Sequence, residues 1–124
     1  MNATPTVRFI RSDDQLAATP YSYTAVVPAS ATLVLAAGAC PLDADGTVVA
    51  PGDVAAQTEQ TIANLRIALA AAGAGLGDIV RTTIYVASGD RGDLVTAWRV
   101  VTAALGAHEP PSTLLGVAVL GYPD

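Results

Sequence analysis

Cys40 and His108 are the side chains best suited to nucleophilic or metal chemistry, and they are the single cysteine and the single histidine of the sequence. A thiol and an imidazole can act as nucleophile and base when they lie within hydrogen-bond reach. Nothing in the sequence places this pair together: a lone buried cysteine is more often a small apolar residue, and His108 lies between a helix end and two prolines, as a loop residue does. Two such ligands do not complete the usual zinc site within one chain, so we expect no metal and no other cofactor.

A glycine-rich stretch and two acidic pairs are the other short patterns with a possible chemical role. Residues 73–77 (GAGLG) are similar to a phosphate-binding loop, but they follow a predicted helix and precede a predicted strand, the reverse of the order that such a loop requires. The pairs Asp43 with Asp45 and Asp13 with Asp14 fall in predicted turns, where aspartate is favoured for its hydrogen bonds to the backbone. We therefore predict a connection at 73–77 and turn residues, not acid–base catalysts, at the aspartates.

The charges of the sequence are few and mostly acidic. All six cations are arginines, the formal net charge is -5 and the pI is about 4.5. No basic face is available to neutralise phosphates, so nucleic acid is not an expected partner. No apolar run approaches the about 18 residues of a membrane span, the first residues do not resemble a secretion signal, and a single cysteine excludes an intrachain disulfide. These features predict a cytoplasmic protein with no membrane partner.

The N-terminal half predicts three strands. Residues 6–10 are short and rich in β-formers, and we interpret them as an edge strand. Residues 21–27 and 31–37 predict a hairpin, with its turn at 28–30. Residues 43–46 (DADG) predict a second tight turn, with glycine at the position that favours positive φ.

Two helices are predicted in the C-terminal half. Residues 53–72 combine abundant alanine with Asp53 as N-cap and Gly73 as C-cap, and the apolar face of this helix is expected to pack on a sheet. Residues 90–105 form the second helix, which has Trp98 as its largest apolar anchor.

The two remaining strands complete an α+β layout. Residues 78–87 alternate as a strand does, whereas residues 113–120 are apolar at nearly every position and so require cover on both faces. We expect a single domain over residues 1–124, with two helices packed on one face of a mixed β-sheet. No helix is left for the other face, and 52% hydrophobic residues is high for so small a chain, so self-association is expected there.

Four segments together resemble one known family. They are residues 19–21 (TPY), 35–41 (LAAGACP), 53–61 (DVAAQTEQT) and 77–86 (GDIVRTTIYV). In combination they are similar to the Rid family, the reactive intermediate deaminases of the YjgF type, which are also called endoribonucleases L-PSP. The similarity covers residues 20–120.

The resemblance implies a chorismate-mutase-like fold and a homotrimer whose sheets line a central β-barrel, with a metabolite-binding cleft at each subunit interface. Members of the family hydrolyse 2-imino or 2-enamino acids to 2-keto acids and ammonia. An arginine on the final strand binds the substrate carboxylate, and a glutamate further along orients the attacking water. That glutamate belongs to a strand beyond the segment that ends at Asp124, so we identify no catalytic residue. We expect this strand in the complete protein, because its absence would leave backbone groups of its neighbours unpaired.

The cleft positions match the family only in part. Tyr21 and Gly38 match the family's tyrosine and glycine, but Ala37 stands where a serine often precedes that glycine. The family pattern Pro-x-Arg-(Ser/Ala) aligns with residues 110–113, so Ser112 stands in the place of the arginine. A serine hydroxyl cannot reproduce a bidentate, charged contact with a carboxylate.

Three hypotheses for function follow from the resemblance and its departures. The first is a homotrimeric member of a subgroup that lacks the arginine, whose interface pockets bind a more neutral metabolite and whose imine deaminase activity is weak or absent. The second is a 2-imino acid deaminase in which Arg99 supplies the missing cation, although a solvated helix arginine is the simpler interpretation. The third, an endoribonuclease or translation inhibitor, rests on the older family name alone. The predicted ligand-binding residues are Tyr21, Gly38, Ala39, Trp98, Arg99, Ser112, Thr113 and Leu114.

Overall fold

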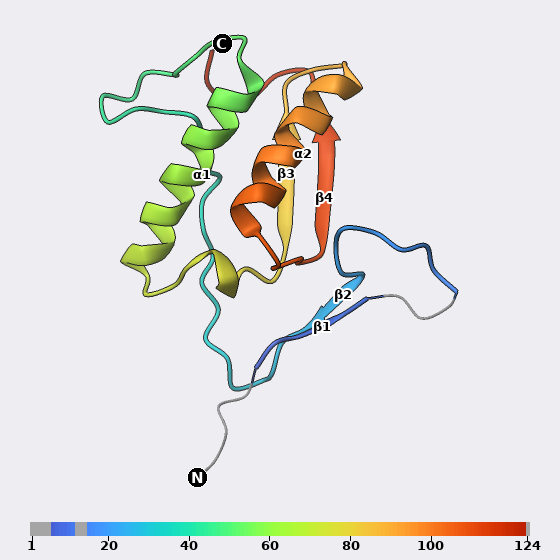
Figure 1. Cartoon of the computed structure of the whole chain (residues 1–124). Coiled ribbons are helices and arrows are strands. Elements are labelled where there is room, and N and C mark those ends of the chain that lie inside the picture. The colour runs from blue at the N-terminus through green and yellow to red at the C-terminus, as the bar shows by residue number, and fades with distance from the viewer. Residues whose placement is uncertain (1–5, 12–14, 124) are drawn as a thin grey trace.

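The structure is a computed structural model that describes residues 6–11 and 15–123, so the predicted pair Asp13 and Asp14 lies outside the described residues. It has the expected α+β class (Figure 1). In chain order its elements are β1 (Arg8–Ile10), β2 (Thr24–Val26), α1 (Val54–Ala71), a short 3₁₀ helix (Leu76–Asp78), β3 (Thr82–Val86), α2 (Arg91–Leu105) and β4 (Ser112–Gly116).

Both helices begin at the aspartates that the sequence indicates. The Asp53 carboxylate accepts a hydrogen bond from the Ala56 amide at 3.0 Å, and the Asp90 carboxylate accepts one from Gly92 at 2.8 Å. Each bond satisfies one of the free amides in a first helical turn. The C-cap of α1 is Ala72 and not Gly73, which lies one residue further along with φ of 78°.

Strands β3 and β4 are parallel and are joined through α2, which packs on one face of the pair (Figure 1). Parallel strands require such a crossover, and a helix is its usual form. Val86 of β3 and Ala97 and Val101 of α2 are buried between them. Helix α1 lies beside α2 and packs chiefly against it (Figure 1).

The predicted mixed sheet is replaced by two sheets of two strands each. Strand β2 pairs with β1 in an antiparallel ladder and does not form a hairpin with residues 31–37, and β3 pairs with β4. Residues 31–37 form no strand and are all exposed. Apolar, β-forming side chains do not make a strand unless another backbone supplies ladder partners, and none of the described residues does so here.

The face of β3 and β4 that points away from α2 is uncovered by the described residues. Thr83 and Tyr85 on β3, with Thr113 and Leu115 on β4, alternate outward and are exposed. Strand β4 ends at Gly116 and not at the predicted residue 120. The expected cover for this apolar segment is therefore not provided within the described part of the chain. No described helix has both the length and the apolar character of a membrane span.

Candidate functional site

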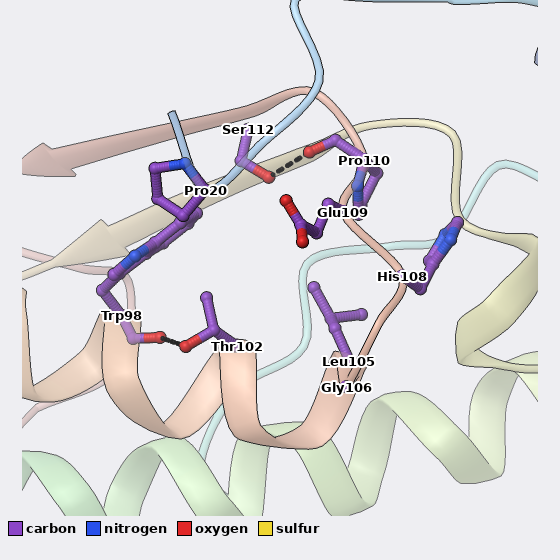
Figure 2. Close-up of a pocket in the computed structure, with 9 residues that line it drawn as sticks. All are labelled: Pro20, Trp98, Thr102, Leu105, Gly106, His108, Glu109, Pro110 and Ser112. Atoms are coloured by element: carbon purple, nitrogen blue, oxygen red, sulfur yellow. Dashed lines mark hydrogen bonds between the residues drawn. The ribbon is translucent and has the colours of Figure 1, made fainter. Parts of the chain in front are cut away.

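A small pocket lies between the C-terminal half of α2 and the start of β4 (Figure 2). Its volume is about 140 Å³, and the segment around Pro20 closes one side. The lining residues are Pro20, Trp98, Thr102, Leu105, Gly106, His108, Glu109, Pro110 and Ser112. Two predicted ligand-binding residues, Trp98 and Ser112, therefore share one pocket although 14 positions separate them in the sequence (112 − 98).

Trp98 forms one wall of this pocket, and two tyrosines pack behind it. Trp98 meets the ring of Tyr21 edge to face, with centroids 6.3 Å apart, and Tyr21 meets Tyr23 at 6.0 Å. The hydroxyl of Tyr23 donates to the carbonyl of Ala17 at 2.8 Å. Edge-to-face pairs of this kind hold rings in place as well as bury apolar area. The predicted residue Tyr21 thus supports the pocket through Trp98, and it does not line the pocket itself.

The hydroxyl of Ser112 forms two hydrogen bonds within its own chain. It donates to the carbonyl of Pro110 at 2.9 Å and accepts from the hydroxyl of Thr82 at 2.7 Å. A hydroxyl has one hydrogen, so Ser112 keeps no hydrogen to offer to a ligand while these bonds are in place. Ser112, predicted to stand in the place of the family arginine, is therefore neutral, and its one hydroxyl hydrogen is already used.

Glu109 is the acidic group of the pocket, and the sequence analysis did not identify it. Its carboxylate forms an ion pair with Arg11, which also donates to the carbonyl of Thr19. The side chains of Arg11 and Glu109 are 50% and 37% exposed, so the pair contributes little to folding stability. In Figure 2 the Glu109 carboxylate points into the space bounded by Ser112, Thr102 and Leu105.

Ser22 anchors the segment that carries Glu109. It is 2% exposed, and both its amide and its hydroxyl donate to the Glu109 carbonyl, at 2.9 and 2.7 Å. These bonds join the segment after Tyr21 to the residues that lead into β4. No sequence pattern marks this role, because a serine between two tyrosines has no local partner of this kind.

His108 and Cys40 have separate partners, so the structure gives no support to a nucleophile–base pair. The His108 Nε2 atom lies 2.7 Å from the Ile79 carbonyl, which can only accept, so Nε2 carries the hydrogen of this bond. The ring of Phe9 lies edge to face at 5.1 Å. The Cys40 thiol faces the carbonyl of Gly38 at 3.8 Å. Among the described residues, no three His, Cys, Asp or Glu side chains gather as a metal site would require.

Asn64 holds the segment that follows the predicted residues Gly38 and Ala39. Its side-chain amide donates to the carbonyls of Cys40 and Leu42, both at 2.8 Å, while its oxygen accepts from Gln60 at 3.0 Å. Helix α1 thus positions the segment after Gly38 through the side chain of Asn64. The sequence carries no signal for this contact, because a helical asparagine off the apolar face is ordinarily solvated.

The remaining predicted residues are distributed over other surfaces. Arg99 lines a groove between α1 and α2, not the pocket of Ser112. Thr113 is exposed on the opposite face of β4, and Leu114 is half-buried on the same face as Ser112. Gly38 is exposed, Ala39 is half-buried, and neither lines the pocket. Within the described chain, the structure brings together Tyr21, Trp98 and Ser112.

Comparison with known proteins links this geometry to one family. The family model described as endoribonuclease L-PSP matches residues 12–124. A RutC family protein of Pyrococcus abyssi is 30% identical over 101 residues, which are 82% of this chain and 76% of that protein. The 2-iminobutanoate/2-iminopropanoate deaminase of Salmonella typhimurium is 40% identical over 55 residues, which are 44% of this chain and 42% of the deaminase.

A solved structure extends the similarity to the fold. The crystal structure of YyfB from Yersinia pestis, a protein of unknown function of the conserved Rid family, superposes with a TM-score of 0.81 at 28% identity. The match covers 94% of this chain and 90% of YyfB.

Proposed function

This chain belongs to the endoribonuclease L-PSP family, which includes the Rid proteins, and on that premise we propose that it binds a small uncharged metabolite beside Ser112, with imine deaminase activity weak or absent. One observation carries the proposal. No lysine or arginine is among the described residues that line the pocket, and the only hydroxyl at the position of the family arginine is already engaged.

A carboxylate ligand is disfavoured in this pocket. The substrates named for the Salmonella relative, 2-iminobutanoate and 2-iminopropanoate, both carry a carboxylate. Here that group would lie near the carboxylate of Glu109, whose charge Arg11 balances only from a partly exposed position. Loss of a charged bidentate contact typically costs about 2–3 kcal/mol of binding, or about a hundredfold in rate. A neutral ligand avoids this cost.

We propose that a second copy of the chain completes the pocket, as one contact of a homotrimer. A volume of about 140 Å³ is below the about 300–1,000 Å³ of typical small-molecule sites, so a further wall is needed for a metabolite. Apolar area for a further contact of the trimer lies on the uncovered face of β3 and β4, on the side of the strands opposite the pocket, with Tyr85 54% and Leu115 44% exposed. Leu35, in the segment 31–37, is 91% exposed and is another apolar side chain that a partner copy would cover.

The two other hypotheses have less support. A deaminase that uses Arg99 requires this side chain beside the substrate, but Arg99 lines a different groove from Ser112. A ribonuclease requires a surface that binds phosphates, whereas the net charge is -5.

The test is to place the arginine back and follow carboxylate binding. Trp98 is the only tryptophan, so its fluorescence reports ligand binding in the pocket. The probe is 2-oxobutanoate, the keto acid that hydrolysis of 2-iminobutanoate gives. We expect no saturable fluorescence response from the wild type. Ser112→Arg should give a saturable response, with an affinity for 2-oxobutanoate at least about tenfold higher than that of the wild type. Ala70→Arg is the matched control, because it adds the same charge at an exposed position of α1 outside the pocket.

The sample is first shown to be folded and its mass in solution is measured by sedimentation. Deaminase turnover is then measured on 2-iminobutanoate generated in place, for the wild type and both variants. Measurable wild-type turnover at least as fast as that of Ser112→Arg, or saturable binding of 2-oxobutanoate by the wild type, would contradict the proposal. An equal gain in Ser112→Arg and Ala70→Arg would show that the pocket is not the site of carboxylate binding.

A further inference from the structure

A second hollow lies on the other side of α2, in the groove between α1 and α2. Its volume is about 560 Å³, within the range of small-molecule sites. The lining residues are Glu59, Ile62, Ala63, Arg66, Arg99, Val100, Ala103 and Ala104. None of these residues lines the pocket beside Ser112, so the two sites are distinct.

The groove combines an apolar floor with cationic side chains. On α1, Ile62 and Ala63 lie one turn before Arg66, so the apolar atoms and the guanidinium occupy one face of that helix. On α2, Arg99 and Ala103 are also one turn apart, so a guanidinium and an apolar side chain again share one helix face. The small alanine side chains of both helices leave the space that forms the hollow.

Both arginines of the groove are available to a ligand. Neither Arg66 nor Arg99 forms an ion pair or a hydrogen bond through its side chain with any described residue, although Glu59 lines the same groove. Two unpaired guanidinium groups that border one hollow repel each other, and an anion between them relieves that repulsion. The two arginines border this groove in a chain of net charge -5, whose other surfaces mostly repel anions.

We propose that the groove between α1 and α2 binds a small amphiphilic carboxylate. Its head group lies between Arg66 and Arg99, and its hydrocarbon part lies along Ile62, Val100 and Ala103. The charged side chains of the groove sum to +1, from two arginines and one glutamate. A monoanion neutralises this charge, whereas a dianionic phosphate would exceed it. The apolar floor favours a ligand with a hydrocarbon part over a simple inorganic anion, because it buries that part away from water.

The proposal is independent of the function proposed for the Ser112 pocket. It rests on side chains of α1 and α2 that do not line the pocket beside Ser112. It therefore holds whether or not that pocket binds a neutral metabolite.

Calorimetric titration of the whole chain with octanoate tests the proposal, with 1-octanol and acetate as probes that lack the charge or the tail. We expect saturable binding of octanoate, and binding of both other probes at least about tenfold weaker. The double variant Arg66→Gln/Arg99→Gln should bind octanoate about tenfold more weakly, since each exposed ion pair contributes about threefold. Arg91→Gln is the matched control, because Arg91 is an exposed arginine of α2 outside the groove.

Three outcomes would overturn the proposal. They are the absence of saturable heat from octanoate up to about 10 mM, binding of 1-octanol as tight as that of octanoate, and wild-type affinity in the double variant. Thermal unfolding followed by circular dichroism verifies that each variant is folded. All the substituted arginines are exposed, so folding is not expected to change.

Discussion

Replacement of Asn64 by aspartate tests whether one helical amide holds the segment after Gly38. In the wild type, the Asn64 Nδ2 atom donates to the carbonyls of Cys40 and Leu42, both at 2.8 Å. Aspartate has nearly the same shape but no hydrogen to donate at neutral pH. The change therefore removes two hydrogen bonds and sets a carboxylate oxygen against two carbonyl oxygens. The bond from Gln60 to the other oxygen can remain.

The expected loss of stability follows from these contacts. Each lost hydrogen bond costs about 1 kcal/mol, and the repulsion between the new charge and the carbonyls adds to this. We expect the free energy of unfolding to fall by about 2–4 kcal/mol in total. With a urea dependence of about 1–3 kcal/mol per molar, the midpoint of urea unfolding should fall by about 1–2 M.

Ala63→Asp provides the control, because it adds the same charge at an exposed position of α1. Its cost should stay below about 1 kcal/mol, as expected for helix propensity alone. Hydrogen exchange supplies a local measurement: the Val49 amide, which donates to the Pro41 carbonyl at 2.9 Å, should lose protection in Asn64→Asp and not in Ala63→Asp. Equal urea midpoints for the two variants would refute the assignment of Asn64 as the residue that positions this segment.

Two further predictions concern packing at the end of β4 and just before its start. A Cβ atom at Gly116 would lie 2.5 Å from the Ser88 carbonyl oxygen, so Gly116→Ala should destabilise the fold by about 1–3 kcal/mol in urea unfolding. Gly77→Ala, where a Cβ meets nothing within 4 Å, should change stability by less than about 1 kcal/mol, and equal losses would contradict the clash. Ser22→Ala removes one buried hydrogen bond to the Glu109 carbonyl and should cost about 1 kcal/mol, with a change in tryptophan emission; an unaltered melting curve would contradict this.

Local patterns of the sequence predicted both helices and the N-terminal cap of the first correctly. Asp53 and Asp90 begin α1 and α2 because a cap bonds to an amide two or three residues ahead, within reach of sequence reasoning. The turn that begins at Asp43 is confirmed for the same reason: its carboxylate accepts from the amides of Asp45 and Thr47, and Gly46 has φ of 80°. The family was also correctly identified from short motifs.

Local sequence patterns did not predict which strands pair. Residues 31–37 have the composition of a strand, yet β2 pairs with β1 and leaves this segment without a ladder partner among the described residues. A strand requires hydrogen bonds from a backbone that can lie anywhere in the chain, and its own side chains do not specify which one.

The sequence by itself determined that serine, and not arginine, stands at position 112. Only the tertiary structure decided what surrounds it. The Ser112 hydroxyl is engaged by Thr82, 30 residues away, and Arg99 lines another groove although it follows Trp98 directly in the sequence. Adjacent residues of a helix point about 100° apart, so the neighbour of a pocket residue need not face that pocket. The chemistry of the pocket beside Ser112 therefore depends on residue types, which the sequence gives directly, and on contacts between distant residues, which form only in the folded chain.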